Sequence, residues 1–154
     1  MTDFIRFPGG KAKALTFSYD DGPREDLPLV EIFKKYGMHG TFNLNSGLYG
    51  TSGWYLTEQE IRDLYLPAGQ ELACHMLTHP FPTRLTAPRL VYEITEDRRR
   101  LEALTDGIVC GMAYPYGDYN AETIALLKTA GIAYARTTRS TEWFSLPPCP
   151  EWAY

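Results

Sequence analysis

The sequence predicts an α/β fold built around a mainly parallel sheet. Five short apolar runs alternate with segments whose apolar residues have helical spacing. Strand–helix alternation of this kind is typical of right-handed crossovers between parallel strands. The chain has 154 residues, of which 44% are hydrophobic, and this is enough to bury one sizeable core. We therefore expect a single domain over residues 1–154.

The first half of the chain contains three expected strands and two expected helices. Apolar runs at 14–19, 40–45 and 71–76 are the strands. The first helix ends at Gly37, and its apolar positions are Leu29, Ile32, Phe33 and Tyr36. Thr57 and Glu60 form a capping box that starts the second helix, which continues through Ile61, Leu64 and Tyr65.

The second half repeats the alternation with two more helices and two more strands. Thr86 is expected to cap a longer helix, whose apolar positions are Leu90, Ile94, Leu101 and Leu104. A fourth strand is expected at 108–114. Asn120 starts another helix that runs through Ile124 and Leu127 to Gly131, and residues 132–136 are the fifth strand.

Composition excludes several classes of protein. The formal net charge is -4 with signs evenly spread, so we expect no basic surface for nucleic acid, and Arg98-Arg99-Arg100 reads as a solvated helix face. No apolar stretch approaches the ~20 residues of a membrane span. The N-terminus lacks a basic segment followed by an apolar one, so the chain as written is expected to be cytoplasmic. Cys74, Cys110 and Cys149 lack metal-site spacing and are expected to be buried thiols.

Three expected strands deliver polar or turn-forming groups at their ends. The first delivers Asp20-Asp21-Gly22, the third His75 with His79 four residues on, and the fourth Tyr114-Pro115-Tyr116-Gly117. In parallel α/β sheets the chemistry gathers where strands end and loops begin. Singly, Asp-Asp-Gly is usually a turn and a His-x3-His pair is usually not a site. Their joint placement on successive strand ends favours a functional site.

The chemistry of these groups points to a divalent metal ion. Two neighbouring carboxylates repel each other unless a cation, a shared proton or solvent lies with them. Two imidazoles and a carboxylate are ordinary ligands of zinc and other first-row ions. Asp20 and Asp21 face opposite ways while extended, and Gly22 permits a turn that breaks this alternation. Cys74 should face away from His75, and His39 is expected to be structural.

The same stretches resemble the motifs of the polysaccharide deacetylases, carbohydrate esterase family four. Residues 16–22 (TFSYDDG) resemble the T-F-D-D-G motif with Ser-Tyr inserted, residues 75–79 (HMLTH) are similar to H-[ST]-x-x-H, and residues 113–117 (AYPYG) to R-x-P-Y-G. The resemblance, which covers residues 14–139, implies a deformed, incomplete (β/α) barrel of the NodB-homology type. It also implies a metal-dependent hydrolase that removes N- or O-linked acetyl groups from sugars.

The resemblance also assigns roles to individual residues. Asp21, His75 and His79 would be the metal ligands, and Asp20 the general base that takes a proton from water. The backbone N–H of Tyr116 would help to hold the developing oxyanion. The expected ion is zinc, with cobalt, nickel and manganese as alternatives. The expected substrate is an acetylated carbohydrate such as chito-oligosaccharide, peptidoglycan or xylan.

Two departures from the family pattern lead to further expectations. Ala113 stands where the family has an arginine that orients the base, and Arg136 at the end of the fifth strand is predicted to reach the same carboxylate instead. No histidine follows His79 to act as the family's general acid, and five strands fall short of a barrel of ~250 residues. We therefore expect either a chain truncated at its C-terminus or a natural minimal form whose closing segment is lost or supplied by another subunit. The open apolar edge favours a homo-oligomer.

Two other functions are compatible with the same residues. A catalytically impaired carbohydrate-binding module would keep the metal cleft and stack sugars on Trp54, Tyr114, Tyr119 or Trp143, although core packing accounts for most aromatic residues. A non-haem iron oxygenase would use the same two histidines and one carboxylate. The free Asp20 and the loop at 114–117 fit hydrolysis better.

Overall fold

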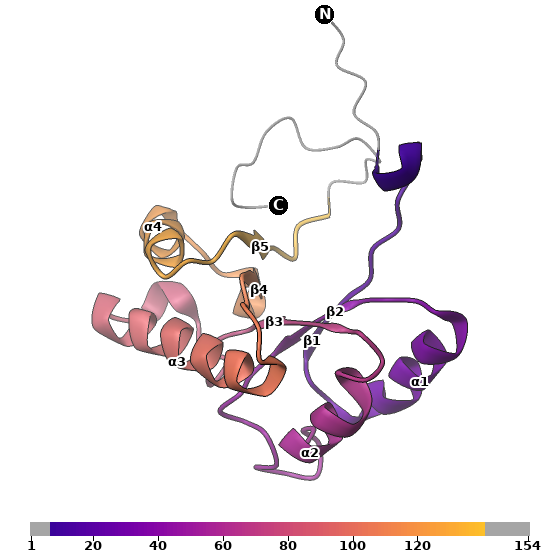
Figure 1. Ribbon diagram of the computed structural model, residues 1–154. Coiled ribbons are helices and arrows are strands. Elements are labelled where there is room, and N and C mark those ends of the chain that lie inside the picture. Colours follow the sequence, from indigo (N-terminus) through magenta and orange to yellow (C-terminus); the bar gives the residue numbers. More distant parts are fainter. Residues whose placement is uncertain (1–6, 141–154) are drawn as a thin grey trace, which may run out of the picture.

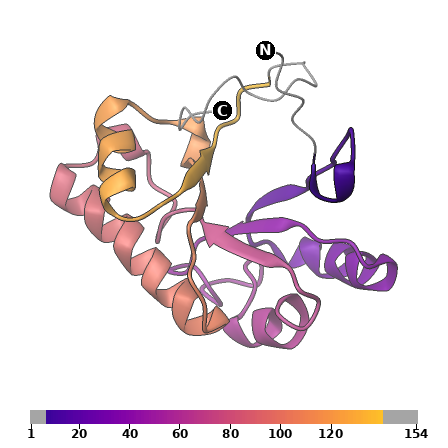
Figure 2. The ribbon, with the colours of Figure 1, turned by 45° about the horizontal axis from the view of Figure 1, so that its top comes forward.

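The computed structural model describes residues 7–140 and, within them, contains one five-stranded sheet in which every neighbouring pair is parallel. Sheet order follows chain order: β1 (Ser18–Asp21), β2 (Thr41–Leu44), β3 (Glu71–Cys74), β4 (Gly111–Ala113) and β5 (Tyr134–Arg136). The sheet curls, and the helices lie along its outer side (Figures 1 and 2). The expected incomplete (β/α) barrel is confirmed.

The helices occupy the predicted places between the strands. They are α1 (Leu27–Tyr36), α2 (Glu58–Glu60) with a π-helical turn (Ile61–Tyr65), α3 (Ala87–Thr105) and α4 (Ala121–Thr129). Short 3₁₀ turns lie at Pro8–Gly10, Arg24–Asp26, Pro82–Arg84 and Pro115–Gly117. Among these described helices, none combines the length and apolar character that crossing a bilayer requires.

The predicted helix starts are confirmed in position, with one difference in chemistry. Thr57 and Glu60 form the full capping box, and the Asn120 side chain accepts a hydrogen bond from the backbone N–H of Thr123. Thr86 occupies the N-cap of α3, but its side chain makes no capping hydrogen bond. A cap normally bonds the second or third backbone N–H of the helix. Pro88 occupies the second position and has no N–H, so one of these two donors is missing.

The strands are shorter than the apolar runs that predicted them. The first strand was expected at 14–19 but spans 18–21, and Leu15 is 79% exposed. The fourth strand was expected at 108–114 but spans 111–113, and Ile108 is 84% exposed. Apolar character alone therefore overestimated these strands at their N-terminal ends. The shift of β1 places both Asp20 and Asp21 inside the strand.

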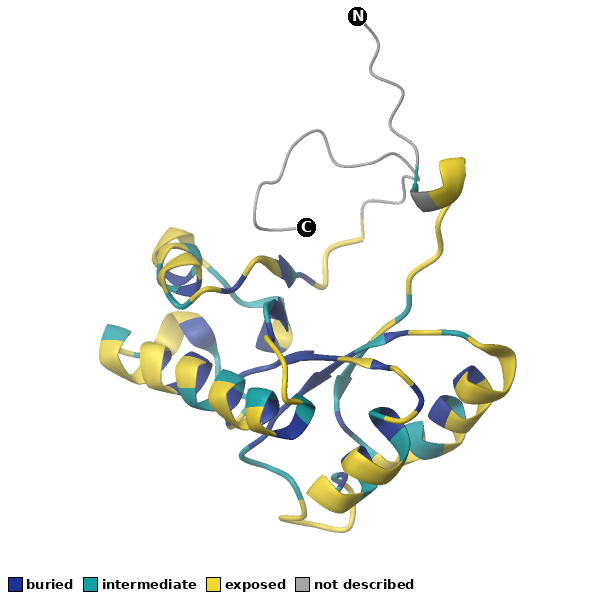
Figure 3. Ribbon diagram, viewed as in Figure 1, coloured by how far each residue is buried: buried dark blue, intermediate teal, exposed yellow. Residues whose placement is uncertain are grey.

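The two faces of the sheet differ sharply in polarity. Strands β2, β3 and β4 are buried along most of their length (Figure 3). The helix-facing side is buried and carries Phe42, Leu44, Leu72, Cys74 and Met112. Each such large apolar side chain contributes roughly 1.5–3 kcal/mol when fully buried. Cys74 is thus the buried thiol that was expected, whereas Cys110 is half-buried and Cys149 lies outside the described residues.

The opposite, concave face is lined mainly by polar groups at its N-terminal end. Thr41 and Tyr134 both donate hydrogen bonds to the carboxylate of Glu71. A pocket of about 340 Å³ lies over this layer, and its lining also includes Ser18, Asn43 and Arg136. Gly111 leaves room for Tyr134, because a Cβ there would lie 2.2 Å from the tyrosine Oη. The concave face therefore has a polar layer near the amino ends of the strands and continues from there to their carboxyl ends.

Candidate metal centre and active site

Three of the predicted site residues meet at the carboxyl ends of β1 and β3. The Nε2 atoms of His75 and His79 lie 3.3 and 3.2 Å from Oδ1 of Asp21. They lie 3.1 Å from each other. His75 is 2% exposed, whereas Asp21 and His79 are only partly buried, so the cluster opens to solvent on one side. The structure thus brings together the predicted ligand set.

Backbone geometry at the end of β1 separates the two neighbouring carboxylates. Asp21 has a φ of 69° and Gly22 a φ of 68°, so both adopt the left-handed conformation. The break in strand alternation was expected at Gly22, but it begins one residue earlier, at Asp21 itself. Aspartate enters this conformation more readily than most residues other than glycine. Asp21 therefore turns towards the histidines while Asp20 keeps the direction of the strand.

The donor set fits a divalent metal ion. His75 Nδ1 lies 2.8 Å from the carbonyl oxygen of Ala113, which can only accept, so Nδ1 carries the proton and Nε2 faces the cluster. Electron pairs of three groups converge there and repel unless a proton or a cation lies among them. Tetrahedral zinc with bonds of 2.0–2.2 Å separates its ligand atoms by about 3.3–3.5 Å. The distances between the three atoms are close to this value.

Electrostatics favour a neutral His79 and an ionised Asp21, the forms that bind metals. The neighbouring imidazole of His75 holds the pKa of Asp21 below its usual value, against the opposing effect of burial. Burial, together with the neighbouring His75, lowers the pKa of His79. Close by, burial and the charges of Glu25, Asp20 and Asp21 raise the pKa of Asp26 to about 6.

Asp20 lies beside the cluster and is held by two other strands. Arg136 on β5 donates from Nη2 to both carboxylate oxygens, at 2.5 Å for Oδ2. Asn43 on β2 donates to Oδ1 at 3.0 Å, and Arg136 Nε donates to Ser18 at 3.0 Å. The predicted contact between Arg136 and Asp20 is confirmed. It takes place where the curl of the sheet brings β5 towards β1.

The predicted residue Tyr116 forms one wall of the centre. It has a φ of 60° and is 55% exposed. Its ring stacks on Phe81 with centroids 3.8 Å apart and meets the edge of His79 at 4.5 Å. Trp54, in the loop after β2, is 43% exposed and packs edge-on against Tyr55 at 4.7 Å. Use of the Tyr116 N–H as an oxyanion donor stays a prediction.

The other aromatic residues considered for sugar stacking have different environments. Tyr114 is 2% exposed and stacks on Tyr119 with centroids 4.8 Å apart. Both rings pack with the core, as expected for most aromatic residues. Trp143 lies outside the described residues. His39 is exposed, and its Nδ1 lies 3.0 Å from the carbonyl oxygen of Gly69, which agrees with the structural role expected for it.

Sequence reasoning missed three buried polar side chains that support the centre without belonging to the predicted ligand set. Asn43 was not singled out, although it faces the same side of the sheet as Asp20 because the two are register partners. Glu93 and Asp97 were not singled out either, yet both are 0% exposed. Asp97 continues the 3–4 spacing of the apolar stripe of α3, and an acidic residue in such a stripe was the available signal. Burial raises the pKa of Asp97 to about 7, against the hydrogen bonds from Ser46 and His75.

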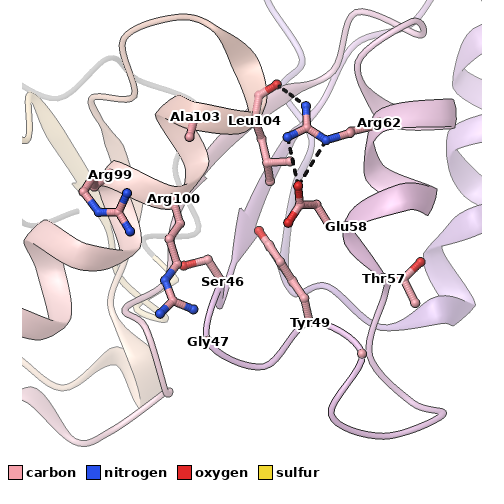
Figure 4. A pocket seen from close by; sticks show the side chains of 11 residues that line it. Ser46, Gly47, Tyr49, Thr57, Glu58, Arg62, Arg99, Arg100, Ala103 and Leu104 are labelled. Carbon is pink, nitrogen blue, oxygen red and sulfur yellow. Dashed lines mark hydrogen bonds and ion pairs between the residues drawn. The ribbon is translucent and has the colours of Figure 1, made fainter.

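A second pocket, of about 490 Å³, lies away from this centre between α3 and the α2 region (Figure 4). None of the predicted site residues lines it. Its three arginines are already paired with glutamates at 2.8 Å: Arg62 with Glu58, and Arg99 and Arg100 both with Glu96. Because each arginine already has a carboxylate partner within the chain, although two of them share Glu96, we assign the pocket no ligand.

Comparison with known proteins gives consistent matches. The family model described as polysaccharide deacetylase matches residues 7–135. The peptidoglycan-N-acetylmuramic acid deacetylase PdaC of Bacillus subtilis is 29% identical over 121 residues, which are 79% of this chain and 25% of that protein. Chitin deacetylase 3 of Cryptococcus neoformans is 31% identical over 129 residues, 82% of this chain and 30% of that protein. The chain thus spans between a quarter and a third of these relatives.

A solved structure gives the same fold. The deacetylase PplD of Streptococcus pyogenes, in complex with acetate, superposes with a TM-score of 0.79 at 22% sequence identity. The match covers 86% of this chain and 58% of that one. At this level of identity the likeness concerns the fold, and it agrees with the incomplete barrel described above.

Proposed function

This chain belongs to the polysaccharide deacetylase family, and from that premise we propose that it is a metal-dependent hydrolase that removes acetyl groups from a carbohydrate. The observation that carries the proposal is the convergence of Asp21, His75 and His79, with Asp20 held beside them by Arg136. A carboxylate that is not itself a metal ligand, placed next to three candidate ligands, suits the activation of water.

The metal would be held by Asp21, His75 and His79, and zinc is the first choice among zinc, cobalt, nickel and manganese. When bound, such an ion supplies Lewis acidity that acidifies a water molecule and polarises an acetyl carbonyl. The hydrogen bond from His75 Nδ1 to Ala113 fixes the imidazole with Nε2 facing the ligand set. Ala113, which replaces the expected arginine, thus contributes through its backbone.

Asp20 is the proposed general base, which takes the proton from the attacking water. Its two oxygens are oriented by Arg136 and its Oδ1 also by Asn43, so the carboxylate has little freedom to rotate. The backbone N–H of Tyr116 is the proposed donor to the oxyanion. Its ring, stacked on Phe81, is a rigid apolar surface against which a sugar ring packs.

The proposed substrate is an N-acetylated sugar polymer. Two relatives are named as deacetylases of peptidoglycan N-acetylmuramic acid and of chitin, and both polymers carry N-acetyl groups. These names favour an acetyl amide over the acetyl ester of xylan. Half-exposed Tyr116, which contacts His79, leaves room for a long polysaccharide chain rather than an enclosed small molecule.

Metal content and acetate release test the proposal together. The purified protein should carry roughly one zinc per chain, and should release acetate from an N-acetylated chito-oligosaccharide when loaded with zinc or cobalt. Asp21→Asn and His79→Gln should lose the metal. His39→Gln is the matched control, because His39 lies outside the centre, and it should retain the metal.

Other outcomes would assign a different function. Metal retention at the wild-type level in both ligand variants would refute the proposed centre. Binding of the oligosaccharide by the metal-loaded protein without any acetate release would indicate the binding module instead. Oxygen consumption by the iron-loaded protein would indicate the oxygenase.

A further inference from the structure

The segment that carries both histidines, residues 75–79, is here called the ligand loop. Two of its residues, neither of them glycine, have left-handed backbones: Met76 with a φ of 62° and His79 with a φ of 56°. Such conformations are unfavourable for L-amino acids and persist only where the surroundings hold them in place. The ligand loop therefore needs contacts that fix its backbone.

Asp97, at the middle of α3, fixes the start of the ligand loop. It accepts a hydrogen bond from the backbone N–H of His75 at 3.1 Å. Its other oxygen accepts from the backbone N–H and the hydroxyl of Ser46 at 2.8 and 2.6 Å. Asp97 is 0% exposed, and burying a carboxylate is costly unless hydrogen bonds satisfy it. Three hydrogen bonds, from two backbone N–H groups and one hydroxyl, satisfy its two oxygens.

Glu93, one turn earlier on α3, fixes the second half of the ligand loop. Its carboxylate accepts from the backbone N–H and the hydroxyl of Thr78, both at 2.9 Å. Its backbone carbonyl accepts from the N–H of Leu77 at 3.2 Å. Arg89 pairs with the same carboxylate at 2.6 Å, and the Glu93 side chain is fully buried.

The carbonyl side of the ligand loop is held from β2. Asn45, which is 1% exposed, donates from Nδ2 to the carbonyl oxygens of His75 and Met76 at 2.5 and 2.8 Å. The loop is therefore held between α3, which accepts its N–H groups, and Asn45, which donates to its carbonyls. Neither Glu93 nor Asp97 belongs to the proposed ligand set of Asp21, His75 and His79.

We propose that Glu93 and Asp97 are positioning residues that hold the ligand loop so that His75 and His79 present their Nε2 atoms to one ion. The inference rests on the proposed function for its metal, but the hold on the loop is a property of the metal-free chain. Outer-shell partners of this kind typically contribute 10- to 100-fold to metal affinity. Asp97 should contribute more than Glu93, because it bonds the backbone of a ligand directly.

The test compares the variants Asp97→Asn and Glu93→Gln with Glu102→Gln. Glu102 is a matched control, because it is a carboxylate of the same helix that accepts from a backbone N–H, that of Val109, away from the loop. Cobalt affinity of the metal-free proteins is measured by titration of its visible absorption. We expect about 10- to 100-fold weaker binding for Asp97→Asn, a smaller loss for Glu93→Gln and no loss for Glu102→Gln.

Hydrogen exchange of the metal-free proteins supplies a second readout. The His75 amide should exchange faster in Asp97→Asn and the Thr78 amide in Glu93→Gln, and both should exchange at the wild-type rate in the control. Unchanged cobalt affinity and unchanged exchange at these amides would overturn the inference. A wild-type protein that binds no cobalt would instead refute the proposed function, and exchange would still decide whether α3 holds the loop. If Asp97→Asn fails to fold, Glu93→Gln decides both readouts.

Discussion

Replacing Arg136 with methionine tests how the proposed base is held. Arg136→Met keeps most of the side-chain volume but removes the hydrogen bonds to both oxygens of Asp20 and the one to Ser18. Asn43 would remain as a donor to Oδ1 at 3.0 Å. The Asp20 carboxylate would then be free to rotate away from the direction in which it accepts a proton from water.

The structure gives the size of the expected effect. Hydrogen bonds to a charged group contribute about 1.5–3 kcal/mol. The Arg136 and Asp20 side chains are 34% and 30% exposed, so solvent screening favours the lower part of this range, about 1.5–2 kcal/mol. Since each 1.36 kcal/mol is a factor of ten in rate, kcat should fall roughly 10- to 30-fold. KM should change little, because Arg136 acts on the base.

The assay is acetate release by zinc-loaded protein from an N-acetylated chito-oligosaccharide. Arg139→Met is the control, because Arg139 lies three residues further on and is exposed; its kcat should equal the wild-type value. Arg136→Lys should be intermediate, since an ammonium lacks the planar fork of guanidinium. The reasoning would be wrong if Arg136→Met retained a kcat within about threefold of the wild type with its zinc content unchanged.

Three further changes test the fold around the centre. Gly47→Ala would place a Cβ 2.5 Å from the carbonyl oxygen of Leu77, so thermal melts should show a loss of about 1–3 kcal/mol, and an unchanged melting temperature would contradict the contact. Thr57→Ala removes the capping box with Glu60 and should cost about 1 kcal/mol, or about 2–4 °C in melting temperature; Thr57→Ser should retain most of it. Asp26 has a folded-state pKa of about 6, above the unfolded value of 3.8, so its folded form binds the proton more tightly and its contribution to stability rises as pH falls from about 6 to 4. In metal-free protein, Asp26→Asn should therefore stabilise the fold at pH 7.5 and lose most of this advantage at pH 4.5; an advantage equal at both values in denaturant melts would contradict the shift.

The meeting of Asp21, His75 and His79 could be predicted from the sequence, because each lies at or just after the end of a strand that its own local pattern identifies. In a parallel sheet the carboxyl ends of the strands lie at one edge, so Asp21, His75 and His79 had to approach one another once those strands were recognised. The contact between Arg136 and Asp20 was predicted differently: the family motif has an arginine where this chain has Ala113, and Arg136 was the arginine at the end of another strand.

The supports of the centre could not be predicted in the same way. Asp97 contacts Ser46 across 51 positions of the chain, and no local pattern encodes that pairing. The left-handed backbone of Asp21 was also missed, because aspartate adopts ordinary strand geometry as well and only the packed loop selects the turn. The prediction that the first strand includes residues 14–17 was wrong, because apolar side chains there, such as Leu15, are exposed rather than buried.

The conformation of Asp21 restricts the replacements that this position tolerates during evolution. Glycine enters the left-handed region freely and asparagine does so more readily than most residues, whereas β-branched residues strain the turn. A divergent copy of this protein that needs no metal ligand here would therefore retain asparagine or glycine as the last residue of its first strand. The left-handed backbone would then persist after metal binding was lost, and the residue at this position would still indicate descent from a metal-binding ancestor.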